Sequence, residues 1–170
     1  MSADELAHEV GAAAADELSS ALARIEHCIS QLSDEQVWSR SGDGLNSIGN
    51  LVLHLGGNVR QWIISGLGGV PDTRNRPAEF AENGPIPKTE LLVGLRTIVD
   101  DAKAVLASLS AEQLTRARRI QGFEMTGLDA IFNSVPHFRG HTQEIIHMTR
   151  SLLGDKYVFF WTPSTPEQGA

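Results

Sequence analysis

Two histidines near the end of the chain are spaced so that both could bind one metal ion. His137 and His141 lie four residues apart within Val135–Glu144, a stretch that we expect to be helical. At ~100° per residue, their side chains lie about 40° apart on one helical face, and Glu144 falls within about 20° of His137. Imidazole is the commonest protein ligand of metals, so this face offers two or three ligand groups to one point. The pair alone is a weak signal, because two solvated histidines on a helix have the same spacing.

A third histidine, His54, lies in the middle of a second predicted helix, among apolar residues. One interpretation is a buried imidazole that is hydrogen-bonded to a backbone carbonyl or to Asn58. The other is a metal ligand, because helices packed side by side would bring three mid-helix histidines to one depth. Gly56 and Gly57 each weaken this helix by ~1 kcal/mol relative to Ala. They would let a neighbouring element or a ligand approach closely.

Four amphipathic helices must position these histidines. Apolar residues recur at helical spacing over four segments, which are Asp4–Leu32, Ser47–Gly66, Thr89–Leu109 and a last one from Gly127 or Leu128 to Leu153. Asn46 or Ser47 offers a cap for the second helix, and Gly154 ends the last one. The sequence therefore predicts an all-α protein, a four-helix bundle whose core can host a metal site.

Shorter features interrupt or join these helices. Pro136 lies inside the last helix, so we expect a kink just ahead of His137. Ser110, followed by Glu112 and Gln113, predicts a turn after the third helix. Residues 116–126, around Gly122, fit a short extended hairpin before the fourth helix better than they fit a helix.

The connection between the second and third helices is unusually long. Residues 67–88 contain seven glycines and prolines, which predicts neither a helix nor a central strand. Loops beyond ~12–15 residues in compact domains tend to be functional or disordered. The segment Arg74–Phe80 brings opposite charges and an aromatic ring. It is either a surface strap held by Arg–Glu pairs or a wall of a substrate pocket, with Arg74 or Arg76 facing an anionic group.

The length of 170 residues fits one domain, with the bundle over residues 1–155 and an aromatic strap and tail over residues 156–170. The strap, Tyr157–Trp161, is a concentrated apolar patch. Such a patch at a terminus is typical of a packing segment or a subunit contact. Because symmetric dimers are the commonest oligomers, we expect a homodimer.

The charge and the cysteine content limit which binding partners and which cellular compartment are expected. With 14 Lys and Arg against 21 Asp and Glu, the formal charge is −7, so neither nucleic acid nor an anionic membrane is an expected partner. No segment matches a signal peptide or the ~20 apolar residues of a membrane span. The single cysteine, Cys28, excludes an intramolecular disulfide and is expected to be a buried, non-catalytic thiol. These features predict a cytoplasmic protein.

Three parts of the sequence together resemble the DinB/YfiT-like superfamily of small bacterial metal-binding bundles, in particular one of its uncharacterised subfamilies. They are Ser47–Asn58 (SIGNLVLHLGGN), Arg74–Phe80 (RNRPAEF) and the late His137-x-x-x-His141. The resemblance covers nearly the whole chain. It implies a four-helix bundle with a three-histidine metal site, usually dimeric.

The resemblance also implies a role for each histidine. His54 matches the ligand on the second helix, and His137 and His141 match the pair on the fourth. Glu144 stands where Gln is more common in the superfamily. Whether Glu144 is a fourth ligand or a hydrogen-bonding neighbour stays open.

Characterised relatives include enzymes that use glutathione, mycothiol or bacillithiol as the nucleophile. The expected function is therefore that of a divalent-metal-dependent enzyme, an S-transferase, hydrolase or isomerase that acts on a small molecule with an external thiol. Zn or Ni is the expected ion, since imidazole sites accept late first-row metals. Asn58, Arg74 and Arg76 are placed to hold the polar body of the thiol. The alternative is a metal-binding or stress-response protein without turnover.

A ferritin-like di-iron oxidase is a further alternative. Glu5-x-x-His8 and Glu144-x-x-His147 both match the Glu-x-x-His element of that class. That class also needs an inward glutamate from each of the two remaining helices. The second helix, Ser47–Gly66, contains no Asp or Glu, so the sequence does not favour this alternative.

Overall fold

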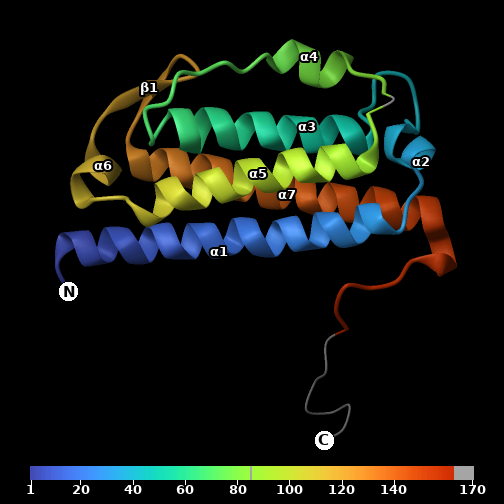
Figure 1. Ribbon diagram of the computed structural model, residues 1–170, viewed down its shortest axis with the longest axis horizontal. Coiled ribbons are helices and arrows are strands. Elements are labelled where there is room, and N and C mark those ends of the chain that lie inside the picture. Colours follow the sequence, from blue (N-terminus) through green and yellow to red (C-terminus); the bar gives the residue numbers. More distant parts are fainter. Residues whose placement is uncertain (85, 163–170) are drawn as a thin grey trace, which may run out of the picture.

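Four long helices lie side by side in the computed structural model, which describes residues 1–84 and 86–162. They are α1 (Ala3–Ser30), α3 (Ile48–Val59) with its continuation η1 (Arg60–Ser65), α5 (Lys88–Ala107) and α7 (Gly127–Leu153) (Figure 1). The predicted four-helix bundle is confirmed. The continuation η1 is a π-helix, a form that sequence periodicity over six residues does not distinguish from an α-helix.

The directions of the helices explain the long connection. In Figure 1, α1 and α7 run from left to right, whereas α3 and α5 both run from right to left. Because α3 and α5 are consecutive, parallel and packed together, the chain between them must return along the whole bundle. A 20-residue helix such as α5 is about 30 Å long, a span that no short turn covers.

This returning segment contains a short helix, α4 (Arg76–Ala81), which corrects the expectation that residues 67–88 hold none. The Asn75 side chain accepts a hydrogen bond from the Ala78 backbone N–H and caps its start. Pro77 lies in the first turn, where its missing N–H would have no helical partner anyway. The proline therefore helps to begin this helix, although prolines in a sequence usually predict that no helix forms.

Three short helical elements and one hairpin complete the described chain. The helix α2 (Asp34–Trp38) and the 3-10 turn η2 (Gly154–Lys156) follow α1 and α7, and α6 (Ala111–Thr115) replaces the turn expected after α5. The predicted hairpin is confirmed: β1 (Arg118–Ile120) pairs antiparallel with β2 (Phe123–Met125). Its turn residues, Gln121 and Gly122, have φ values of 52° and 87°, as a two-residue hairpin turn of type I′ requires.

Polar caps fix where α3 and α7, the helices of the three clustered histidines, begin. The Ser47 hydroxyl accepts a hydrogen bond from the Asn50 N–H, and the Asn50 side chain accepts one from the Ser47 N–H. Thr126 and Asp129 form the same reciprocal cap at the start of α7. Gly154 follows the last turn of α7 with φ 54°. These caps agree with the predicted starts and with the predicted end.

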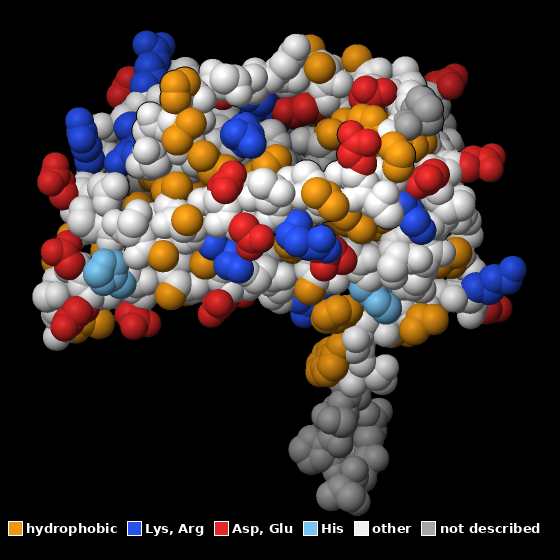
Figure 2. Space-filling view, in the orientation of Figure 1, with side chains coloured by type: hydrophobic (Ala, Val, Ile, Leu, Met, Phe, Trp, Pro, Cys, Tyr) orange, Lys and Arg blue, Asp and Glu red, His pale blue; other side chains and the backbone are white. Residues whose placement is uncertain are grey.

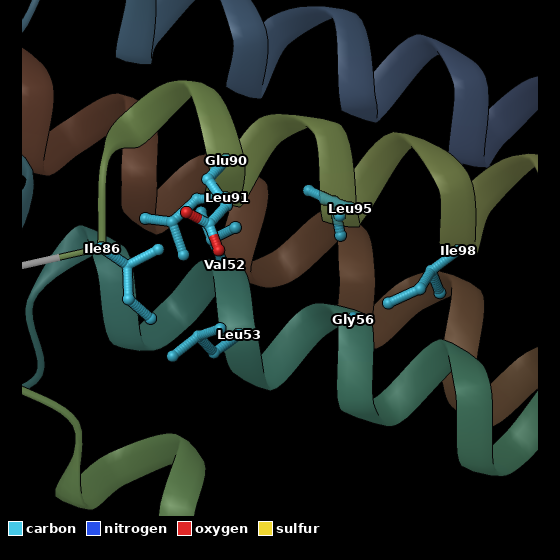
Figure 3. Close-up of a pocket in the computed structure, with 9 residues that line it drawn as sticks. Val52, Leu53, Gly56, Ile86, Glu90, Leu91, Leu95 and Ile98 are labelled. Atoms are coloured by element: carbon cyan, nitrogen blue, oxygen red, sulfur yellow. The ribbon is translucent and has the colours of Figure 1, made fainter. Parts of the chain in front are cut away.

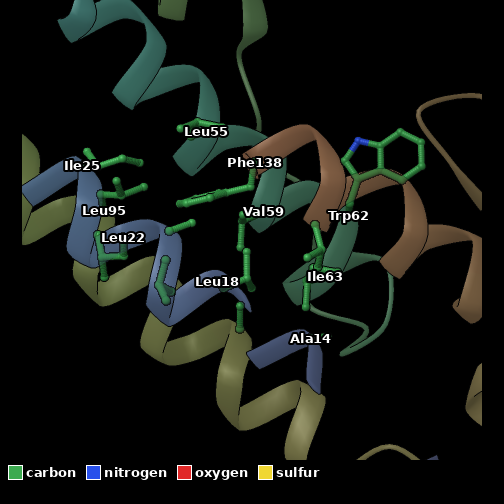
Figure 4. Packing of buried hydrophobic residues seen from close by; sticks show 14 of the residues in the cluster. Ala14, Leu18, Leu22, Ile25, Leu55, Val59, Trp62, Ile63, Leu95 and Phe138 are labelled. Carbon is green, nitrogen blue, oxygen red and sulfur yellow. The ribbon is translucent and has the colours of Figure 1, made fainter. Parts of the chain in front are cut away.

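The apolar stripes of the four helices meet in one core (Figure 4). Phe138 of α7 is fully buried and lies close to Leu55 and Val59 of α3 in this view. Its burial fixes the rotation of α7 about its axis. The neighbouring His137 and, one turn later, His141 are therefore held at the edge of the core and remain partly exposed.

The chain after α7 returns against α1. The backbone carbonyl of Val158 lies 2.6 Å from His27 Nε2 and accepts a hydrogen bond of 3.1 Å from Gln31 Nε2. The strap Tyr157–Trp161 thus packs on α1, while residues 163–170 of the expected tail lie outside the described residues. Within the described chain, no helix combines the length and the hydropathy that a membrane crossing demands.

Candidate metal centre

Three histidines from two antiparallel helices converge on one point. His54 comes from α3, and His137 and His141 come from α7. One nitrogen from each ring lies within 4.8 Å of the others, and the Nε2 atoms of His54 and His137 are 3.0 Å apart. The rings stand nearly perpendicular to one another. The structure thus brings together the three residues that the sequence and the family resemblance predicted as ligands.

This geometry fits a divalent ion held by imidazoles. Tetrahedral zinc with Zn–N bonds of ~2.0–2.1 Å places two ligand nitrogens about 3.3 Å apart. The His54–His137 nitrogen separation of 3.0 Å and the upper limit of 4.8 Å for all pairs lie on either side of that value. A tetrahedral ion held by three protein nitrogens would keep one position open, as in catalytic sites and unlike closed structural sites.

A buried carboxylate holds His54 in place. Glu79 Oε2 lies 2.9 Å from His54 Nδ1, and Arg74 binds both carboxylate oxygens, with Nε–Oε1 at 2.7 Å and Nη2–Oε2 at 2.9 Å. The three side chains are all less than one-tenth exposed. Glu79 reaches this position because Gly57 has no side chain, and a Cβ on that residue would lie 2.0 Å from Glu79 Oε1.

The position of Glu79 also selects the tautomer of His54. Its Nδ1 lies 2.9 Å from Glu79 Oε2 and 3.1 Å from Arg74 Nη2, and only one of these contacts can be a hydrogen bond in a given tautomer. The Nη2 group already donates to the carboxylate. With the proton on Nδ1 directed to Glu79, the lone pair of Nε2 faces the other two histidines. A carboxylate behind a metal-binding histidine is the usual device for this purpose.

Glu144 performs a similar role for His141. Its Oε2 lies 2.7 Å from His141 Nδ1, and its side chain is about half exposed. In this geometry Glu144 is a hydrogen-bonding neighbour on the outer side of the ring, and it is not part of the three-residue cluster.

Burial keeps two of the imidazoles neutral. Desolvation, and then the nearby charges of His141, His54, Arg74 and Arg76, lower the pKa of His137 to about 4. Desolvation also lowers the pKa of His54, although the hydrogen bond to Glu79 opposes it. Metals bind the neutral form of imidazole, so these two histidines would not have to lose a proton to bind one near pH 7.

The helix α4 covers one side of the site. The Phe80 ring lies 4.9 Å from the His54 ring, centre to centre, and the Arg76 guanidinium lies 4.9 Å above the Phe80 ring. Arg74 forms the buried ion pair with Glu79. Asn58, once considered a partner of His54, instead accepts a hydrogen bond of 2.8 Å from the Ser134 hydroxyl of α7. Arg76 is therefore the exposed member of the three residues predicted to hold a thiol.

Sequence reasoning missed Glu79 as the partner of His54. The residue lies 25 positions away, in a segment without helical periodicity. The available signal was the mixed charge of Arg74–Phe80, which predicts either a surface strap held by Arg–Glu pairs or a wall of a substrate pocket. That ion pair exists, but it is buried against a histidine and does not lie on the surface.

Two cavities lie close to α3 without including the histidines. One of about 250 Å³ opens between α3 and α5, with apolar walls and a single carboxylate, Glu90 (Figure 3). The other, of about 300 Å³, lies beneath α4 and is bounded by Arg74, Glu79 and Glu82. Leu53 and Ile86 line both cavities.

The comparisons with known proteins agree with this fold. A model of the family described as "Protein of unknown function (DUF1572)" matches residues 6–165. A conserved protein from Enterococcus faecalis matches in structure with a TM-score of 0.70 and 18% identity, over 83% of this chain and 95% of that one. A DinB-like protein, YjoA, from Bacillus subtilis matches with a TM-score of 0.65 and 18% identity, over 88% and 99% of the two chains. Among curated proteins, none matches the sequence significantly.

Proposed function

Because the chain belongs to the DUF1572 family and has the fold of DinB-like proteins, we propose that it is a divalent-metal-dependent enzyme that works with an external low-molecular-weight thiol. The observation that carries this proposal is the convergence of His54, His137 and His141 within 4.8 Å at the edge of the core. A bound divalent ion would lower the pKa of a coordinated thiol or water and so supply a nucleophile at neutral pH.

The residues of the chain have separate tasks in this proposal. The three imidazoles hold the ion, and Zn or Ni fits such a ligand set. Glu79 and Arg74 fix the orientation of His54 from behind. Phe80 shields that ring from solvent on the α4 side, so the face toward His137 and His141 stays free for the ion.

The thiol comes from outside the chain in this proposal. Cys28 is buried beneath the strap, with its Sγ 3.9 Å from the Tyr157 hydroxyl, and burial raises the pKa of its thiol. A thiol with these properties is a poor nucleophile. Arg76 is exposed beside the site and presents a planar fork that suits a carboxylate of the external thiol.

The reaction class proposed is that of an S-transferase, hydrolase or isomerase acting on a small molecule. We further propose that the chain acts in the cytoplasm as a homodimer, in line with the single buried cysteine and the exposed aromatic strap.

The test is a titration of the cobalt-substituted protein with bacillithiol, mycothiol, glutathione and cysteine. We expect at least one of them to produce a thiolate-to-cobalt charge-transfer band. Arg76→Ala should weaken its binding without releasing cobalt, and Arg119→Ala, on the hairpin, serves as the matched control. If the protein holds one tightly bound ion but no thiol produces the band, the protein binds metal without using a thiol, and the alternative of a non-catalytic metal-binding protein becomes the better account.

A further inference from the structure

One apolar groove and one apolar projection lie on the same face of the bundle. The groove, of about 510 Å³, runs between α1 and α7 and is lined almost entirely by apolar side chains, namely Val10, Ala13, Ile131, Phe132, Val135 and Pro136. Phe132 on its rim is 69% exposed. An apolar patch of this kind on a small acidic protein marks a contact surface.

The projection is the strap Tyr157–Trp161. Tyr157 and the Val158 carbonyl anchor it on α1 at Cys28, His27 and Gln31. Its other side chains remain largely in solvent, with Phe159 58% and Trp161 68% exposed. In Figure 2 hydrophobic side chains gather where the chain leaves the bundle below α1.

The groove and the strap lie at two separate positions along α1, so a two-fold axis between them could pair each with the other in a second copy. The groove covers residues 10–17 of α1, and the strap covers residues 24–31 of the same helix. Their centres are therefore about 20 Å apart at 1.5 Å per residue. The midpoint falls between Ser20 and Ala21. In an antiparallel pair of copies related by a two-fold axis through this point, the strap of one copy would face the groove of the other, and the reverse.

The charges of α1 match this antiparallel arrangement. Residues 1–23 contain five acidic residues and no Lys or Arg, and the first basic side chain is Arg24. Glu17 at the groove and Arg24 at the strap lie equally far from the midpoint. Across such an axis each Glu17 would face the partner's Arg24. Within one chain, Glu17 pairs with Arg139 at 3.2 Å and keeps about half of its side chain exposed, so it is accessible to a further cation.

We infer that the α1–α7 face is the dimer interface, in which the strap of each protomer fills the groove of its partner. This inference rests on the proposed homodimer and specifies which surfaces meet. The contact is self-complementary and closes on itself, as a two-fold interface must. The Glu17–Arg24 pairs would lie nearest the two-fold axis, with one strap-in-groove contact on either side of them.

The first experiment measures the dimer dissociation constant of the full chain by sedimentation equilibrium. Phe132→Glu in the groove and Trp161→Glu in the strap should each weaken the dimer at least tenfold. Both residues are more than two-thirds exposed in one protomer, so neither change disturbs the core. Val93→Glu, on an exposed site of α5, is the control and should leave the constant unchanged.

The second experiment exchanges the charges. Glu17→Arg and Arg24→Glu should each weaken the dimer, because like charges then meet across the axis, and the double variant should recover most of the loss.

Each contrary outcome is distinct. A monomeric native chain would overturn the homodimer itself. A dimer that is insensitive to Phe132→Glu or to Trp161→Glu would leave the homodimer standing and overturn this interface. Loss of the dimer in both apolar variants without recovery in the charge-swapped double variant would overturn the antiparallel arrangement.

Discussion

Glu79 Oε2 lies 2.9 Å from Nδ1 of His54, and both side chains are buried. This contact joins the long connection between α3 and α5 directly to the candidate metal centre. The segment that makes the bundle topology possible thus also supplies the group that orients His54.

Replacing Glu79 should therefore weaken metal binding although the residue is not a ligand. We expect Glu79→Gln to lower the affinity for zinc by about 10- to 100-fold, because the amide no longer favours the proton on His54 Nδ1. Glu144→Gln is the matched control, since Glu144 contacts His141 in the same way but is about half exposed. Its effect should be smaller. Competition with a chromophoric chelator measures the zinc affinity of both variants. An equal loss of affinity in the two would contradict the special role of Glu79.

The metal-free protein should lose stability in mild acid. The pKa of His137 is lowered to about 4 in the folded state, whereas an unfolded histidine titrates near 6.5. Between these pH values His137 is protonated in the unfolded chain but stays neutral in the folded chain. The stabilising contribution is therefore complete above about pH 6.5 and falls as the pH drops towards 4.

Urea denaturation of the metal-free protein at a series of pH values measures this dependence. His137→Gln should flatten the curve between pH 6.5 and 4, since glutamine does not titrate. An unchanged slope in that variant would show that other groups cause the acid sensitivity.

Packing between α1 and α5 should respond to Gly11. A Cβ at this position would lie 2.1 Å from the backbone carbonyl oxygen of Leu106, so Gly11→Ala forces the helices apart. We expect a loss of about 1–3 kcal/mol in the free energy of unfolding despite the higher helix propensity of alanine. Gly94→Ala, with no atom within 4 Å, should instead stabilise the protein by about 0.4–1 kcal/mol. Urea denaturation measures both changes in the free energy of unfolding. If Gly11→Ala and Gly94→Ala shift it in the same direction, this account of Gly11 is wrong.

Much of the fold was predictable from the sequence because helical periodicity and end signals are local. Ser47 begins the helix that carries His54, and Gly154 ends the helix that carries the other two histidines, as the sequence predicted. The candidate ligands were predicted from the one-turn spacing of His137 and His141 together with the family resemblance, which adds His54. The convergence of these two with His54 required the packing of α3 against α7.

What the sequence could not predict depends on contacts between distant segments. The buried Arg74–Glu79 pair forms only when the returning segment packs on Gly57, and no local pattern marks either residue as buried. The helix α4 was missed because Pro77 was interpreted as a breaker, whereas it lies in the first turn. The pairing of Glu144 with His141 Nδ1 depends on rotamers, which spacing does not specify.

The central claim is that His54, His137 and His141 bind one divalent ion. The most direct test is metal analysis of protein purified without a histidine tag and then dialysed against zinc or nickel at neutral pH. We predict about one ion per chain in the native protein, in His8→Ala, in His27→Ala and in His147→Ala, and none retained by His54→Ala, His137→Ala or His141→Ala. A native chain that takes up no metal, or loss of metal in His147→Ala alone, would contradict the account.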